Sequence, residues 1–231
     1  MPIILITGSS RGIGYYLSNY YLEKGYVVVG CSRSSCDINH KNYNHIVADL
    51  SNEAEILNIF KIIRKEYSRL DVLINNAAIN PAILNVAFLP YKTIQNIYSV
   101  NVFAPIMFCR ESVKLMIRIK FGRIINLGSM ATRHEVAGEA LYTSTKASIN
   151  AFTRVLSKEV ACFGITVNVV SPSVIDTELS KAINEVALEE VLNRNAIKEY
   201  GNLVDISNTI DFLIKEESIS VTGQIIYLGG V

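Results

Sequence analysis

Three residues in the middle of the chain have the types and spacing of a proton-transfer site. Tyr142 and Lys146 are four residues apart in a segment with a helical pattern, so their side chains share one helix face. A phenol ordinarily titrates near pH ~10, and a lysine held beside it favours the phenolate and brings this pKa toward neutrality. Ser129, thirteen residues before Tyr142, can hydrogen-bond a carbonyl oxygen that the tyrosine protonates. A tyrosine and a lysine at this spacing also occur by chance on surface helices, so the prediction depends on the surrounding elements.

Short apolar segments alternate with longer amphipathic segments along the chain. Strands are predicted at Ile3–Thr7, Tyr26–Cys31, His45–Ala48, Asp71–Asn75, Arg123–Leu127, Thr166–Ser171 and Gln224–Leu228. Helices are predicted at about Gly12–Lys24, Glu53–Tyr67, Tyr91–Ile119, Tyr142–Phe163, Asp176–Asn195 and Leu203–Lys215. Continuous apolar strands between helices indicate a parallel sheet covered on both faces. We therefore expect one α/β domain spanning residues 1–231, a Rossmann-type doubly wound parallel sheet of seven strands with helices on both faces.

Two connections in this pattern are irregular. The long helical segment Tyr91–Ile119 is expected to break near Asn101–Pro105. Only about a dozen polar residues separate Arg33 from the third strand, which is short for a packed crossover helix. A loop, or one helical turn at most, is expected there.

The first predicted strand runs directly into a glycine-rich loop that precedes a helix. Gly8, Gly12 and Gly14 have the spacing Gly-x-x-x-Gly-x-Gly. Glycines at such a position allow a tight turn and a close backbone approach to a pyrophosphate, which the helix N-terminus stabilises. A glycine loop alone can be only a turn, but its place between the first strand and the first helix favours a dinucleotide site.

Composition excludes several classes of protein. The net charge of +1 on 231 residues argues against nucleic-acid binding, because proteins that bind nucleic acids typically carry a basic excess. No apolar run reaches the ~18–20 residues of a membrane helix, and no basic segment precedes the apolar N-terminus as in a signal peptide. Neither the cysteines nor the histidines have metal-ligand spacing, so we expect no metal site. The cysteines are expected to be free thiols in a reducing, cytoplasmic compartment. The cysteines are Cys31, Cys36, Cys109 and Cys162.

The combined motifs resemble the short-chain dehydrogenase/reductase family over essentially the whole chain. The motifs in the family's order and spacing are Thr7–Gly14 (TGSSRGIG), Asn75–Ala78 (NNAA), Asn101, Ser129 and Tyr142-x-x-x-Lys146. Within the family the chain looks closest to the 3-oxoacyl-[acyl-carrier-protein] reductases. The segments that indicate this are Gly122–Ser129, Gly164–Pro172, Ile175–Thr177 and Val221–Gln224.

The resemblance implies a role for each catalytic residue. Tyr142 is expected to be the general acid in carbonyl reduction and the base in alcohol oxidation. Lys146 is expected to lower the pKa of Tyr142 and to bind the nicotinamide ribose, and Ser129 to hold the carbonyl oxygen. Asn101 is expected to shape a helix break whose backbone carbonyl fixes a water molecule; otherwise it is a polar residue without function.

The resemblance also implies a set of cofactor-binding residues. They are Gly8, Ser10, Arg11, Gly12, Ile13, Gly14, Arg33, Asp49, Leu50, Asn76, Ala77, Tyr142, Lys146, Ile175 and Thr177. Asp49 resembles the family's adenine contact, although it could instead cap the following helix in competition with Ser51. Thr177 matches the residue that bonds the carboxamide of the nicotinamide.

Charge at the end of the second strand predicts which cofactor binds. An NAD-preferring site has an acidic residue there to bind the ribose 2′-hydroxyl, but Gly30–Ser34 contains none. Arg33 and Arg11 can instead bracket a 2′-phosphate, which suits the geometry of a guanidinium. We therefore expect NADPH; the alternative is that the arginines are solvated surface charges.

The chain departs from the family's pattern at several positions. Alanine stands at Ala78 and serine at Ser173 where the family usually has glycine. The segment Glu178–Tyr200 corresponds to the family's substrate lid, at about residues 178–200. Carrier-binding members usually present two basic regions near the mouth of the active site; Lys120, with Arg118, keeps one of them. Phe163 replaces the other.

The expected function is an NADPH-dependent ketoreductase, with a β-ketoacyl thioester, free or carrier-bound, as the substrate. A sugar, polyol or small-alcohol dehydrogenase of the same family is the first alternative. A non-catalytic nucleotide-sensing protein is the second, and the intact set Asn101, Ser129, Tyr142 and Lys146 argues against it. The resemblance further implies a homotetramer or homodimer.

Overall fold

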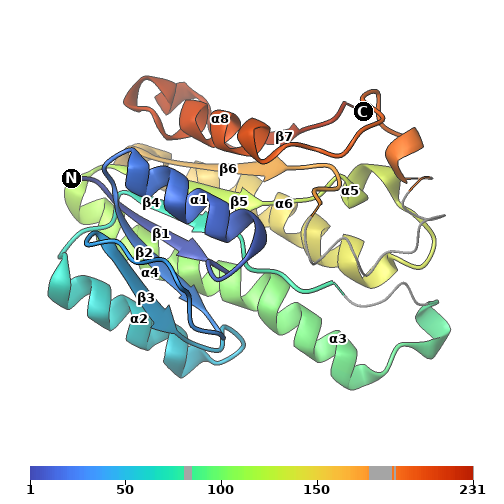
Figure 1. The fold of residues 1–231 in the computed structure, drawn as a ribbon, viewed down its shortest axis with the longest axis horizontal. Coiled ribbons are helices and arrows are strands. Elements are labelled where there is room, and N and C mark those ends of the chain that lie inside the picture. The colour runs from blue at the N-terminus through green and yellow to red at the C-terminus, as the bar shows by residue number, and fades with distance from the viewer. Residues whose placement is uncertain (81–84, 177–188, 190, 231) are drawn as a thin grey trace.

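The structure is a computed structural model that describes residues 1–80, 85–176, 189 and 191–230 (Figure 1). Its described strands form a seven-stranded parallel sheet in the order β3-β2-β1-β4-β5-β6-β7, which confirms the predicted Rossmann-type fold. The strands are β1 (Ile3–Thr7), β2 (Val27–Ser32), β3 (Tyr43–Val47), β4 (Val72–Asn75), β5 (Gly122–Leu127), β6 (Ile165–Ser171) and β7 (Ile225–Tyr227).

The strand order reverses at β1. The chain passes from β1 to β2 and β3 on one side, and then crosses to β4 on the other side of β1. In open sheets of this kind, ligands bind beyond the carboxyl ends of the strands at such a reversal. The loops that follow β1 and β4 therefore border the expected site.

Helices cover both faces of the sheet. The helices α1 (Gly12–Glu23) and α8 (Leu203–Ile214) pack on one face, and α2 (Glu53–Glu66) and α4 (Ala104–Ile119) pack on the other (Figure 1). The helix α6 (Ala140–Val160) packs on the same face as α2 and α4. The shorter helices are α3 (Tyr91–Tyr98) and α5 (Ala131–His134).

The strand β1 shows why the sequence folds into covered layers. Its five residues are all buried, and successive side chains point to opposite faces. Ile3 and Leu5 enter the core beneath α2, α4 and α6, whereas Ile4 and Ile6 enter the core beneath α1 and α8. A strand with two buried faces is expected to be apolar on both, as Ile3–Ile6 are, and only Thr7 at its carboxyl end is polar.

The observed strands differ from the predicted ones mainly at β3. This strand begins at Tyr43, two residues before the predicted start, because it pairs with β2 from Val28↔Tyr43 onward. The polar residues before it form no helix, as expected from the short connection.

The long predicted helix is broken where the sequence indicated a break. A π-helix, Ser99–Phe103, separates α3 from α4, slightly before the predicted break at Asn101–Pro105. The helix α6 begins at Ala140, two residues before its predicted start. Most of the predicted helix Asp176–Asn195 lies outside the described residues.

Among the described helices, none combines the length and the apolar character needed to cross a membrane.

Candidate active site

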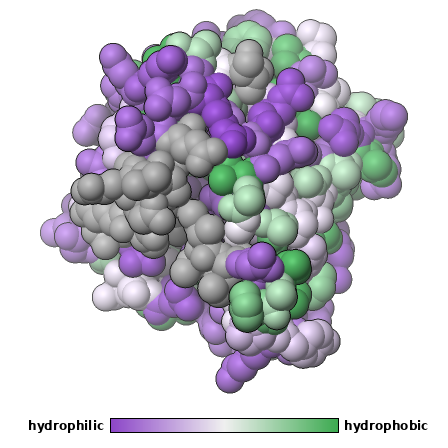
Figure 2. Space-filling view, turned by 90° about the vertical axis from the view of Figure 1, so that its right-hand side faces the viewer, coloured by the Kyte–Doolittle hydropathy of each residue, from purple (hydrophilic) through white to green (hydrophobic). Residues whose placement is uncertain are grey.

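A cavity of about 910 Å³ lies at the carboxyl ends of the strands, at the reversal between β1 and β4. Figure 2 views the molecule from this side, where hydrophilic and hydrophobic residues are mixed over the described surface. The predicted site residues that line the cavity are Gly8, Ser10, Arg11, Gly12, Ile13, Arg33, Asp49, Leu50, Asn76, Ala77, Ser129, Tyr142, Lys146 and Ile175. Gly14 and Asn101 do not line it, and Thr177 lies outside the described residues.

The glycine loop has the backbone that an anion site requires. Gly8 and Gly12 have φ of 70° and 56°, in the left-handed region that favours glycine. A Cβ at Gly14 would collide with the Gly8 carbonyl oxygen and the Asn76 amide, so the start of α1 packs directly on the loop. Arg11, the N-cap of α1, makes no side-chain cap bond, which leaves the first N–H groups of the helix open to a pyrophosphate.

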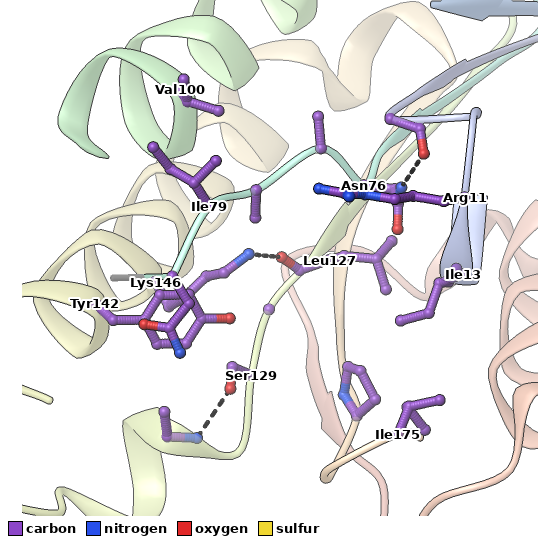
Figure 3. Close-up of a pocket in the computed structure, with 18 of the residues that line it drawn as sticks. Arg11, Ile13, Asn76, Ile79, Val100, Leu127, Ser129, Tyr142, Lys146 and Ile175 are labelled. Carbon is purple, nitrogen blue, oxygen red and sulfur yellow. Dashed lines mark hydrogen bonds between the residues drawn. The ribbon is translucent and has the colours of Figure 1, made fainter. Parts of the chain in front are cut away.

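Asn76 joins the glycine loop to the end of β4. Its side-chain Nδ2 donates to the carbonyl oxygens of Thr7, at 2.8 Å, and Gly8, at 3.2 Å. A dashed line at Asn76 in Figure 3 marks the second of these bonds. The Thr7 hydroxyl in turn accepts from the backbone N–H groups of Asn76 and Ala77, each at 3.0 Å. These bonds hold together the two loops that border the strand reversal.

Asp49, Arg11 and Arg33 all line the cavity. Hydrogen bonds from the Ser51 backbone and hydroxyl hold the pKa of the Asp49 carboxyl below its usual range, and the nearby Arg33 adds to this effect. The side chain that caps α2 is Asn52, which accepts from the Ala54 N–H at 3.0 Å. Neither Asp49 nor Ser51 is the cap that the sequence suggested.

Tyr142 stands on the first turn of α6, and its phenol is almost completely buried. Burial raises the pKa of Tyr142 to about 12, the neighbouring Ser129 hydroxyl opposes this rise, and the charge of Glu139 adds to it. Ser129 follows β5, and its hydroxyl accepts from the Ala131 N–H at 3.1 Å, which leaves its own proton free for another acceptor (Figure 3).

Lys146 lies close to Tyr142, but burial dominates the pKa of this phenol, and the expected lowering by the lysine stays a prediction. Its ammonium donates to the Leu127 carbonyl oxygen at 2.8 Å (Figure 3), and Nζ lies 5.7 Å from the centre of the Tyr142 ring. Burial lowers the pKa of Lys146 to about 8. Because burial penalises both charged forms, the phenol keeps its proton more firmly and the ammonium keeps its proton less firmly than in water.

Asn101 lies in the π-helix and connects it to the segment after β4. Its Oδ1 accepts from the Ile79 N–H at 2.9 Å, and its Nδ2 donates to the Ile79 carbonyl oxygen at 2.8 Å. A weaker bond, at 3.3 Å, reaches the Thr145 hydroxyl of α6. Ile79 and Val100 line the cavity (Figure 3), so this buried amide shapes the wall without reaching into it. Its expected role through a water molecule stays a prediction.

Two titratable residues that were not predicted from the sequence also line the cavity. Glu139 precedes Tyr142 by three residues, and this spacing near the start of α6 was a signal that could have identified it. The His134 Nε2 lies 2.9 Å from Asn195 Oδ1, and the Asn195 amide donates to Ser173 Oγ at 2.6 Å. The serine that replaces the family's glycine thus belongs to a hydrogen-bonded wall whose partners are distant in sequence.

The expected carrier-binding region is not at the mouth of the cavity. Lys120 immediately precedes β5 and Phe163 immediately precedes β6, so both lie at the amino ends of parallel strands. The cavity lies at the carboxyl ends, and the six residues of β5 span about 20 Å. The sequence shows that both residues closely precede predicted strands, but only the strand direction shows that they lie at the opposite edge.

In the described part of the chain, no three histidine, cysteine, aspartate or glutamate side chains gather as a metal site. The four cysteines are free. An open helix N-terminus, a glycine loop and a buried tyrosine–lysine pair along one cavity fit a dinucleotide with its reactive ring beside Tyr142.

Comparisons with known proteins agree with this fit. The family model of the short chain dehydrogenases matches residues 2–187. The 3-oxoacyl-[acyl-carrier-protein] reductase FabG of Buchnera aphidicola is 32% identical over 98% of this chain and 95% of its own length. FabG of Escherichia coli is 29% identical over 99% and 96%. The solved structure of a 4-hydroxyisoleucine dehydrogenase complexed with NADH has a TM-score of 0.87, with 29% identity over 100% of this chain and 98% of that chain.

The fold and the site therefore define a dinucleotide-binding oxidoreductase. The chain belongs to the short-chain dehydrogenase family, as the motifs predicted, and is an NAD(P)-dependent oxidoreductase. The alternative of a non-catalytic nucleotide sensor is not retained.

Proposed function

We propose that this protein is an NADPH-dependent ketoreductase that reduces a β-ketoacyl thioester to the corresponding 3-hydroxyacyl thioester. The observation that carries the proposal is the placement of Ser129, Tyr142 and Lys146 along one cavity that begins at the glycine loop. Two relatives named as 3-oxoacyl-[acyl-carrier-protein] reductases, similar over nearly the full chain, support this choice of substrate.

When bound, the nicotinamide supplies the hydride that reduces the carbonyl carbon. The free proton of the Ser129 hydroxyl donates a hydrogen bond to the carbonyl oxygen, and the Tyr142 phenol transfers its proton to the same oxygen. A pKa of about 12 keeps this phenol protonated at neutral pH, and the alkoxide that forms is a still stronger base. At neutral pH the phenol is therefore in the protonated form that a reduction needs. Lys146 orients the nicotinamide ribose beside the phenol.

The preference for NADPH is supported by charge. Arg11 and Arg33 both line the cavity, and no acidic side chain occurs between Gly30 and Ser34. A guanidinium pair bonds a 2′-phosphate strongly, whereas it gains little from a 2′-hydroxyl. Replacing Arg33 by alanine should weaken NADPH binding by ~10- to 100-fold and leave NADH nearly unchanged.

Calorimetric titration with both cofactors tests this preference. Arg118→Ala, an exposed arginine at the opposite edge of the sheet, is the matched control and should change neither affinity. Equal losses for NADPH and NADH in Arg33→Ala would remove the argument from the 2′-phosphate.

Glu139 favours a second candidate, a dehydrogenase of small hydroxylated or amino-bearing compounds. Within the described residues, no hydrogen bond or ion pair reaches its half-buried carboxyl, which lines the cavity near Tyr142. An ionised carboxyl accepts bonds from hydroxyl or ammonium groups but not from a thioester carbonyl. The relation to a 4-hydroxyisoleucine dehydrogenase is in keeping with such a substrate.

Oxidation of NADPH against a panel of substrates separates the two candidates. The panel contains an acetoacetyl thioester on an acyl carrier and on coenzyme A, free ketones, and keto forms of sugars and amino acids. We expect the highest kcat/KM for a thioester. If the thioester on the acyl carrier is preferred over the thioester on coenzyme A, this preference should decline with added salt, because salt screens docking of the acidic carrier. Higher kcat/KM for a free ketone, with no turnover of either thioester, would transfer the proposal to the second candidate.

We also propose a homo-oligomer, a tetramer or a dimer, on the basis of the family resemblance. Phe103 and Val155 support this proposal, because these apolar side chains on the π-helix and α6 are 59% and 57% exposed. A cytoplasmic location is proposed from the sequence argument that four free cysteines suit a reducing compartment.

A further inference from the structure

Two loops of the cavity carry the arginines that the proposed function assigns to the 2′-phosphate. Arg11 lies in the glycine loop after β1, and Arg33 lies in the β2 loop, residues 32–35. Both arginines are exposed, so the core does not orient their side chains. The separation between the two loops therefore decides whether both guanidinium groups can reach one phosphate.

His45 holds the β2 loop from the neighbouring strand. It lies on β3, at the edge of the sheet beside β2 (Figure 1). Its Nε2 lies 2.9 Å from the Ser34 carbonyl oxygen and 3.1 Å from the Ser32 hydroxyl. Because a carbonyl oxygen can only accept, Nε2 carries a proton and donates to Ser34. The residues on both sides of Arg33 are thus tied to one imidazole.

Tyr43 extends this connection to the glycine loop. It points to the same side of β3 as His45, two residues away. Its hydroxyl lies 2.8 Å from His45 Nδ1 and 3.2 Å from Ser9 Oγ. Ser9 is completely buried in the glycine loop, two residues before Arg11. A continuous chain of hydrogen bonds therefore runs from one arginine loop to the other through β3.

Gly30 makes room for this chain of bonds. A Cβ at this position of β2 would collide with both the Tyr43 hydroxyl and the Ser9 hydroxyl. The Tyr43 side chain can reach across β2 to Ser9 only because no side chain stands between them. The contact is therefore built into three separate segments of the chain rather than formed by one exposed side chain.

We propose that Tyr43 and His45 are positioning residues that select a 2′-phosphorylated adenosine cofactor by fixing the separation of the loops that carry Arg11 and Arg33. The inference rests on the proposed preference for NADPH. A preformed spacing spares the loops the entropy cost of ordering when the phosphate binds. NADH carries a 2′-hydroxyl in place of the phosphate and does not use this spacing, so the affinity for NADH depends far less on the separation of the two loops.

The test compares two probes that differ only in the 2′-phosphate, adenosine 2′,5′-bisphosphate and 5′-AMP. Their dissociation constants are measured by calorimetry on the full-length protein and on the variants His45→Ala and Tyr43→Phe. We expect each variant to lose ~3- to 10-fold of the affinity for the bisphosphate and to bind 5′-AMP within about twofold of the wild type. His45→Gln, which can still donate to Ser34, should recover most of the loss.

Two controls separate positioning from general destabilisation. His40→Ala removes an exposed histidine from the same connection and should leave both probes unchanged. In an Arg33→Ala background, His45→Ala should cause no further loss for the bisphosphate, because the imidazole acts through that loop. Thermal unfolding confirms that each variant is folded. If His45→Ala does not fold, the test uses Tyr43→Phe, which removes only one hydroxyl.

The outcomes distinguish this inference from the proposed function. If the wild type binds the two probes equally, the preference for NADPH is wrong and the inference falls with it. If the wild type prefers the bisphosphate and the folded variants keep that preference, the preference stands and the positioning role is wrong. Equal losses for both probes would likewise reject selection and leave these residues only a structural role.

Discussion

Burial controls the proton-transfer pair at the scale of single residues. It moves the pKa of Tyr142 up to about 12 and the pKa of Lys146 down to about 8, since a low-dielectric site disfavours both charges. The acid of the proposed reduction therefore holds its proton at neutral pH, and the lysine lies much nearer to its neutral form than an exposed lysine does.

Replacing Tyr142 by phenylalanine should reduce turnover by ~10²–10⁴-fold, because the ring stays and the proton donor is lost. Binding of the cofactor should persist and can be followed by titration in the same preparation. Tyr98→Phe is the matched control, since that phenol contacts Ser144 outside the cavity, and it should keep near wild-type turnover. Retention of more than about a tenth of the rate in Tyr142→Phe would reject the assigned role.

Replacing Glu139 by glutamine should move the pH profile of alcohol oxidation to lower pH. The Glu139 charge raises the pKa of Tyr142, so its removal lowers that pKa, and the phenolate needed as a base forms at lower pH. The measurement is kcat/KM for oxidation as a function of pH. Glu135→Gln, an exposed carboxyl on the preceding turn, should leave the profile in place. A shift to higher pH would contradict the sign.

At the scale of elements, the π-helix Ser99–Phe103 lets one amide support a distant loop. It places Asn101 against the backbone of Ile79, and these bonds connect the α3–α4 unit to the segment after β4. π-Bulges often occur at functional sites, where an extra residue in one turn re-aims a side chain.

Asn101→Ala should lower the free energy of unfolding by about 1–3 kcal/mol, because the partly buried N–H and carbonyl of Ile79 lose their partners. Chemical denaturation measures this change. Asn19→Ala, an amide on α1 whose partner is the Tyr15 carbonyl of its own helix, should cost much less. An equal cost at both positions would mean that the bridge to Ile79 adds nothing beyond an ordinary helix contact.

At the scale of the whole molecule, the direction of the parallel strands separates two surfaces. The cavity lies at the carboxyl edge, whereas Lys120 and Phe163 lie at the amino edge. A carrier protein bound beside Lys120 would face away from the cavity of the same chain. Any role of this region in carrier binding thus depends on how several chains assemble.

Light scattering at micromolar concentration should find a tetramer or a dimer. Phe103→Glu should shift the assembly toward smaller species, because a charge would enter the exposed apolar surface that the proposed assembly covers. Phe212→Glu places the same charge on α8, where the phenylalanine is also exposed, and should leave the assembly intact. A wild-type monomer at this concentration would reject the proposal.

The sequence by itself determined the architecture and the members of the proposed catalytic set. Strands such as β1, whose first four residues are all isoleucine or leucine, are apolar on both faces, which is a local property that suits a sheet covered on both faces. The spacing of Tyr142 and Lys146 follows from helix periodicity, and the glycine loop follows from the backbone demands of one turn. Each of these signals lies within a few neighbouring residues, so no tertiary information was needed to interpret them.

Only the tertiary structure decided the electrostatics and the contacts between distant segments. The pKa of Tyr142 is raised mainly by burial, which depends on several elements and not on the residues one turn away. The bonds from His134 through Asn195 to Ser173, and from His45 through Tyr43 to Ser9, join segments separated by tens of residues. A local pattern specifies an element, but burial, strand direction and such bonds arise only when the elements pack together.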